Sequence, residues 1–89
     1  MAKVIYKYQI DITNGQVLTL PRNAEILCVQ NQNEIPCIWA MVDPEQPTEE
    51  RVISVFGTGH EIEEPLKLLY IGTFQLMGGG LVFHCFEEK

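Results

Sequence analysis

One short loop holds the residues best suited to bind an anion, Gly57-Thr58-Gly59-His60. Consecutive backbone N–H groups in such a loop can form a small nest for an anion. The Thr58 hydroxyl and the His60 ring would add further donors. We therefore predict that Thr58, Gly59 and His60 bind a phosphate group. A plain turn between two strands is the alternative.

A second candidate for binding is a run of uncharged amides, residues 30–33, which lies close in sequence to Trp39. Amides beside an aromatic face are typical of a pocket for a planar ligand that forms hydrogen bonds. We predict that Gln30, Gln32 and Trp39 bind the planar part of the ligand. The alternative is a polar hairpin end with Trp39 in the core.

Arg51 is one of only two arginines, the other being Arg22. A guanidinium can pair with a phosphate or with any of the many carboxylates of this chain. We include Arg51 among the predicted ligand-binding residues and leave the pairing with an acidic residue open.

The sequence gives little support for catalysis. Its only serine, Ser54, lies in a strand-like run without the glycines of a nucleophile elbow. His84 alternates with Val82 and Phe86, which favours a structural role. The one pair that we would test for a hydrolase is His60 with Asp43. We predict that the protein is not an enzyme and needs no cofactor.

The three cysteines Cys28, Cys37 and Cys85 each lie in an apolar stretch, and none forms a C-x-x-C pair. Zinc sites require clustered cysteine or histidine ligands, so we predict no metal. An odd number of cysteines without a secretory leader indicates reduced, buried thiols. We therefore expect the protein to act in the cytoplasm.

Charge and hydropathy exclude two classes of partner. The net charge is −6, from 12 acidic and 6 basic residues, and no basic stripe is present. Because nucleic-acid binding depends on phosphate neutralisation, we expect no nucleic-acid partner. No segment approaches the roughly 20 apolar residues that cross a bilayer, so we expect no membrane partner.

Alternation of apolar and polar residues predicts seven strands and no ordinary α-helix. The predicted strands cover residues 4–12, 16–20, 25–32, 36–42, 51–56, 66–77 and 81–86. This pattern is typical of an all-β fold, a small antiparallel sandwich or barrel. We predict one domain over residues 1–89.

Glycines predict two hairpins. Asn14-Gly15 lies between the first two runs and is typical of a type I′ turn, so we expect these strands to pair. Gly78-Gly79-Gly80 predicts a final hairpin. Gly72, inside the first arm of that hairpin, indicates a bulge or a close backbone approach.

Chain length predicts association. A domain of 89 residues buries only about 60–65% of the surface that its unfolded chain exposes. A partner could supply the missing burial. We therefore predict a homo-oligomer.

Several segments carry a resemblance to a known family: residues 20–27 (LPRNAEIL), 30–32 (QNQ), 39–44 (WAMVDP), 57–60 (GTGH), 70–75 (YIGTFQ) and 81–84 (LVFH). Their order and spacing resemble a family of short, uncharacterised proteins found in phages, prophages and bacterial genomes. The resemblance implies a phage setting, where small β-rich proteins often act by binding. Some of them sequester nucleotide-derived immune signals of the host without cleaving them.

The leading hypothesis is thus a phage-type binding protein that sequesters a small, phosphate-bearing, nucleotide-derived ligand without catalysis. The alternative is a protein–protein interaction module, with a phage or host partner and no small-molecule ligand.

Overall fold

Strands make up most of the computed structural model, which describes residues 2–64 and 66–89. They are β1 (Val4–Gln9), β2 (Gln16–Pro21), β3 (Glu25–Gln32), β4 (Ile35–Val42), β5 (Thr48–Gly57), β6 (Leu68–Leu76) and β7 (Leu81–Glu88). A single 3-10 turn, η1 (Met77–Gly79), joins β6 to β7. Within the described residues, no helix is long and apolar enough to cross a membrane.

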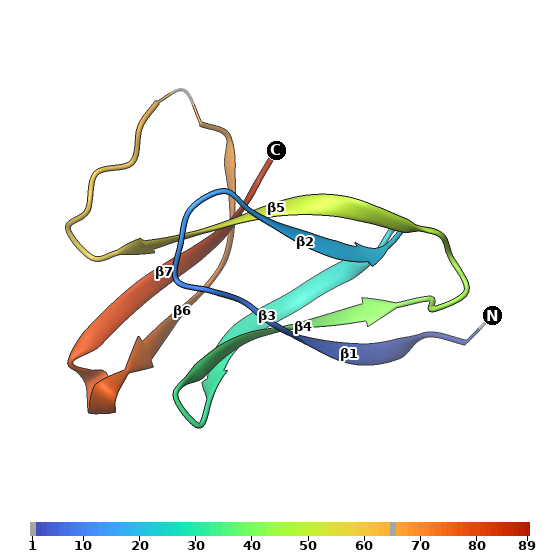
Figure 1. Ribbon diagram of the computed structural model, residues 1–89, viewed down its shortest axis with the longest axis horizontal. Coiled ribbons are helices and arrows are strands. Elements are labelled where there is room, and N and C mark those ends of the chain that lie inside the picture. Colours follow the sequence, from blue (N-terminus) through green and yellow to red (C-terminus); the bar gives the residue numbers. More distant parts are fainter. Residues whose placement is uncertain (1, 65) are drawn as a thin grey trace.

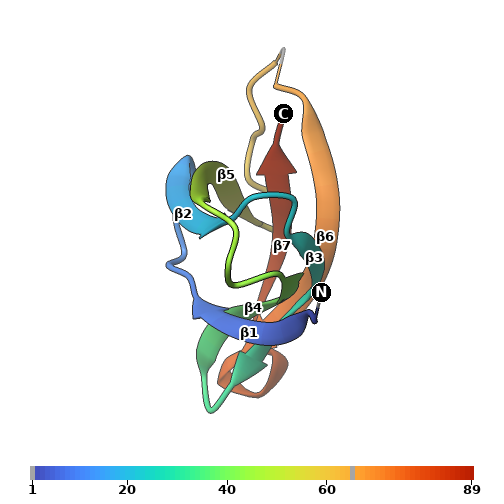
Figure 2. The same ribbon diagram turned by 90° about the vertical axis from the view of Figure 1, so that its right-hand side faces the viewer.

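Two antiparallel sheets pack against each other (Figures 1 and 2). Sheet A has the strand order β1-β4-β3, and sheet B has the order β2-β5-β7-β6. The sheets do not close into a barrel, so the predicted all-β fold is confirmed as a sandwich. The molecule is flat, with principal extents of 42 × 33 × 15 Å.

The core lies between the inner faces of the two sheets. Sheet A contributes Val29 and Ile38, and sheet B contributes Ile53, Val55 and Cys85. These side chains come from every second residue of their strands, as the period-two pattern predicts. Burial raises the pKa of the Cys85 thiol to about 12. Cys85 therefore acts as an apolar core residue at neutral pH.

The predicted hairpin between the first two strands is wrong. β1 pairs with β4 in sheet A, whereas β2 pairs with β5 in sheet B. The chain changes sheets between them: Ile10 N–H donates to Pro36 O, and Thr13 O accepts from Val55 N–H. Figure 2 shows this connection passing from one layer to the other. Ile10, at the start of this connection, is buried in the core.

The tight two-residue turn lies elsewhere, at Asn33 and Glu34 between β3 and β4. Both residues have positive φ, 53° and 67°, as a type I′ turn requires. The Glu34 carboxylate accepts a hydrogen bond of 2.5 Å from the N–H of Met77. This contact joins the β3–β4 turn to the β6–β7 turn. The predicted final hairpin is confirmed.

β3 and β6 lie side by side at one seam of the sandwich without forming a ladder. The seam is closest at Gly72, where an added Cβ would lie 2.9 Å from Cγ1 of Val29. The β6–β7 register also shifts between Tyr70 and Gly72. The predicted bulge and close approach at Gly72 are both confirmed.

The close contact between Gly72 and Val29 predicts that substitutions at these two positions have non-additive effects on stability. Gly72→Ala should destabilise the protein by about 1–3 kcal/mol, because the new methyl group overlaps Val29. In a Val29→Ala background the same change should cost clearly less. Urea unfolding of the four proteins in the cycle measures both costs. Equal costs in the two backgrounds would contradict steric overlap at the seam.

Candidate functional site

Strand register brings three of the predicted binding residues onto one surface, the outer face of sheet A. In β4, Trp39 lies opposite Lys7 of β1 and opposite Cys28 of β3. Gln30 lies two pairs further along, opposite Cys37, and Gln32 lies two pairs beyond that, opposite Ile35. Because side chains alternate across a strand, these side chains share the face that points away from the core.

A shallow hollow of about 310 Å³ opens on this face. It is lined by side chains from all three strands of sheet A: Ile5, Leu27, Cys28, Gln30 and Trp39. Most of this lining is apolar, and it contains one indole ring and one amide, which suits a planar ligand. Lys7 and Gln32 lie on the same face beside the hollow but outside its lining, and the Lys7 ammonium donates to the Gln32 carbonyl oxygen at 2.5 Å.

The predicted anion loop forms a turn. His60 N–H donates to Gly57 O at 3.1 Å, and Thr58 N–H donates to Val82 O at 3.2 Å. Gly59 has a φ of 88°, which a type II turn requires at this position. Two of the N–H groups that an anion nest would use are therefore already bonded to carbonyls. Anion binding by this loop stays a prediction.

Thr58 belongs to a chain of polar side chains on the outer face of sheet B. Its hydroxyl lies 2.7 Å from Nε2 of His84. The other ring nitrogen, Nδ1, lies 3.0 Å from the Thr73 hydroxyl, which in turn lies 2.6 Å from the Tyr70 hydroxyl. The histidine beside Thr58 is therefore His84, whose ring has a hydroxyl at each nitrogen.

Thr73 and Tyr70 were not among the predicted site residues, and His84 was expected to have a structural role. Thr73 lies directly opposite His84 in the β6–β7 ladder, which places the two side chains on one face. The only available signal was the register of the final hairpin. The bulge at Gly72 shifts that register, so counting outward from the end of the strand would have misplaced Tyr70.

Gln30 lies near the hydroxyl chain of His84 across the β3–β6 seam. Gln30 and Asn31 of β3 line a hollow of about 350 Å³ together with Thr73 and Gln75 of β6. The Asn31 amide also donates to Gln75 O. Thr58 and His60 of the predicted anion loop line a different hollow on the protein surface, also of about 350 Å³, so the two predicted halves of the site do not share one hollow.

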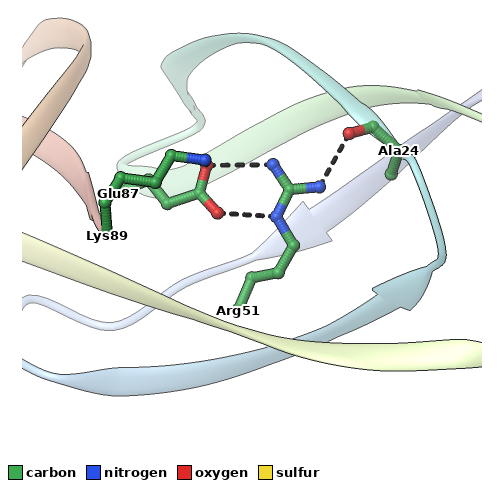
Figure 3. A network of polar contacts seen from close by, with 4 residues as sticks. All are labelled: Ala24, Arg51, Glu87 and Lys89. Carbon is green, nitrogen blue, oxygen red and sulfur yellow. Dashed lines mark hydrogen bonds and ion pairs between the residues drawn. The ribbon is translucent and has the colours of Figure 1, made fainter.

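Arg51 lies between the sheets rather than on the outer face of sheet A (Figure 3). Its Nε and Nη2 donate to the two carboxylate oxygens of Glu87 at 2.6 and 2.9 Å, and its Nη1 donates to Ala24 O at 2.7 Å. These bonds occupy three of the five N–H groups of the guanidinium. The structure thus shows the pairing with an acidic residue. A ligand role for Arg51 stays a prediction.

His60 and Asp43 do not form a catalytic pair. Asp43 precedes β5 and accepts a hydrogen bond from the N–H of Glu45, whereas His60 follows β5. The ten residues of β5 separate them by about 30 Å at 3.3 Å per residue. Ser54 is buried, and its hydroxyl contacts Gly15 N–H and the Glu88 carboxylate.

The family to which the chain belongs spans the whole fold. A family described as a domain of unknown function (DUF7352) matches residues 1–89. The chain belongs to this family. No curated protein and no solved structure matches the DUF7352 chain significantly. The family assignment extends over both sheets and brings no chemistry with it.

The Arg51–Glu87 pair predicts a pH dependence of stability. Arg51 lowers the pKa of Glu87 through its hydrogen bonds and its charge. A carboxyl group whose pKa is lowered by folding stabilises the protein above its ordinary pKa of about 4.3, and this stabilisation is lost as pH falls through the lower, folded value. Urea midpoints of the wild type should therefore fall in acid more steeply than those of Glu87→Gln.

Replacing Arg51 alone should show how much the buried charge of Glu87 destabilises the protein. Arg51→Met leaves the Glu87 carboxylate, 6% exposed, with only the Lys89 ammonium at 3.7 Å, and should cost up to about 3–5 kcal/mol at neutral pH. The double variant Arg51→Met/Glu87→Met should recover part of that loss. A single variant as stable as the wild type would show that the pair contributes nothing to holding the sheets.

Proposed function

We propose that this DUF7352 protein is a non-enzymatic binding protein that sequesters a small, phosphate-bearing, nucleotide-derived ligand. The supporting observation is the gathering of Trp39, Gln30, Gln32 and Lys7 on the outer face of sheet A. These residues come from three strands. The antiparallel register, and not proximity in sequence, makes them neighbours.

The planar part of the ligand lies in the hollow against the indole of Trp39. Stacking on an aromatic ring tolerates different bases and contributes about 1–3 kcal/mol per base. The Gln30 side chain lines the same hollow and offers both a donor and an acceptor to the edge of a base. This combination favours a nucleobase over an aliphatic ligand.

The phosphate lies at Lys7. This ammonium is on the same face as Trp39, directly opposite it in the β1–β4 ladder, and already donates to Gln32. The loop at Thr58, Gly59 and His60 is the other source of donors. Lys7 is favoured because it carries a full charge, whereas two N–H groups of the loop are bonded to carbonyls.

The biological setting comes from the resemblance to short phage and prophage proteins. In that setting the ligand is a nucleotide-derived immune signal of the host, and the protein acts in the host cytoplasm as a homo-oligomer. Holding such a signal without cleaving it lowers its free concentration.

Calorimetry against a panel of cyclic and ADP-ribose-type nucleotides tests the proposal. Trp39 is the only tryptophan, so its fluorescence reports occupation of the hollow independently. We expect one nucleotide class to bind with heat and to change Trp39 emission. No heat from any member of the panel, with the fold confirmed by circular dichroism, would refute this function.

Three substitutions locate the ligand. Gln30→Ala and Lys7→Gln should each weaken binding about ten-fold, since a hydrogen bond to a charged group contributes about 1.5–3 kcal/mol. His60→Ala tests the loop as the other phosphate site and should weaken binding less than Lys7→Gln. A loss for His60→Ala with no loss for Lys7→Gln would move the phosphate to the loop.

Chromatography of recovered ligand tests turnover: intact ligand agrees with sequestration, and a product contradicts it.

A protein–protein interaction module is the second candidate. Large apolar side chains on the surface favour it, notably Leu69 and Tyr70 of β6, which are 53% and 58% exposed. Pull-down from host lysate separates the two functions. A stoichiometric protein partner without any bound nucleotide would support the interaction module.

A further inference from the structure

β1 is an edge strand with uncovered side chains on both faces. It pairs with β4 on one side and has no partner among the described residues on the other. Val4 and Tyr6 point to the inner side, yet they are 39% and 44% exposed, and Ile5 on the outer side is 58% exposed. Only a strand that continues sheet A, together with side chains from its own sandwich, can cover both faces at once.

The free edge of β1 has a defined set of main-chain groups. Ile10 N–H donates to Pro36 O, so Ile10 is a hydrogen-bonded residue of the β1–β4 ladder. Such residues alternate in an antiparallel pair. Tyr8, Tyr6 and Val4 therefore direct their N–H and C=O groups to β4. The intervening residues Gln9, Ile5 and Lys7 direct theirs to the open edge.

We propose that a second copy of the chain pairs with this edge about a two-fold axis, with Tyr6 facing the partner's Tyr6. Outward-directed residues must pair with outward-directed residues, and registers centred on Tyr6 or Lys7 overlap more of β1 than those centred on Ile5 or Tyr8. The Lys7 register places two ammonium groups directly opposite each other. The Ile5 register also places Lys3 directly opposite the partner's Lys7. The Tyr6 register pairs Ile5 with the partner's Lys7 and Gln9 with the partner's Lys3.

The strand is suited to self-pairing. Edge strands are usually protected by proline, a bulge, or charges that meet any incoming strand. β1 contains no proline, and its pairing with β4 is regular over all six residues. In the Tyr6 register each lysine lies opposite an uncharged residue. Pairing would cover the tyrosines that the thin sandwich leaves exposed.

The pairing would also complete the ligand site, a consequence that rests on the proposed function. Ile5 lines the hollow beside Trp39. In the Tyr6 register, Lys7 of the partner subunit lies directly opposite Ile5 on the same outer face. Each hollow would then have two ammonium groups beside it, one from each copy. A ligand with two phosphates is the class that this arrangement fits.

Sedimentation equilibrium of the full chain tests the pairing. We expect a mass of about 20 kDa, twice the 10.1 kDa of one chain. A mass of 10.1 kDa up to the solubility limit would overturn the proposal.

Disulfide trapping tests the register. In a Cys28→Ser background, Tyr6→Cys places two thiols opposite each other in a non-hydrogen-bonded pair, where Cβ atoms are about 4.5–5.5 Å apart. Tyr6→Cys should form a covalent dimer under mild oxidation, whereas Ile5→Cys and Lys7→Cys should form little. Strongest linking through Ile5→Cys or Lys7→Cys would overturn the Tyr6 register, and no linking at any position would overturn pairing through β1.

The two proposals can fail separately. A linked dimer that binds no nucleotide would refute the ligand and leave the pairing intact. Nucleotide binding to a protein of 10.1 kDa would refute the pairing and leave the ligand intact. Lys7→Gln in the dimer should lower affinity for a bisphosphate more than for a monophosphate, because two charges are lost at each hollow.

Discussion

The two sheets depend on the ion pair between Arg51 and Glu87. Arg51 comes from β5 and Glu87 from β7, and the bond to Ala24 O connects both to the start of β3 in the other sheet. A buried pair stabilises a fold only when its geometry is good and its remaining donors are satisfied. Here the carboxylate is held by two N–H groups, and the core beside it is small. The hydrogen bonds of Arg51 therefore act together with apolar packing to set the relative position of the two sheets.

Most strands could be predicted from sequence because apolar and polar residues alternate in them, and the nearly continuous apolar run of residues 36–42 indicated a strand covered on both faces. The role of Gly72 could be predicted because a glycine inside a strand often marks a bulge or a close backbone approach. The pairing of β1 could not. Asn14-Gly15 is a strong local turn signal, but β1 and Ile10 pair with residues more than 25 positions away.

The same limit applies to the site. Gln30 and Gln32 are two residues apart, so a shared face could be predicted from spacing alone. Trp39 and Lys7 join them only through the ladders of sheet A, and His84 meets Thr58 across 26 positions. Arg51 was predicted to bind the ligand, with an acidic partner left open, because nothing local identifies Glu87 as that partner. Most contacts between polar side chains in this fold join residues on neighbouring strands. Such contacts cannot be inferred from spacing along the sequence.

The connectivity of the sandwich also imposes an order on its assembly. The first strand has no ladder partner until β4 exists, and the second has none until β5 exists. During synthesis, residues 4–21 would therefore leave the ribosome as unpaired, apolar strand segments while the β3–β4 hairpin forms first. Topologies with such non-local pairs fold slowly. The newly made chain is thus exposed to mispairing, chiefly through the segment that ends as the open edge of the mature protein.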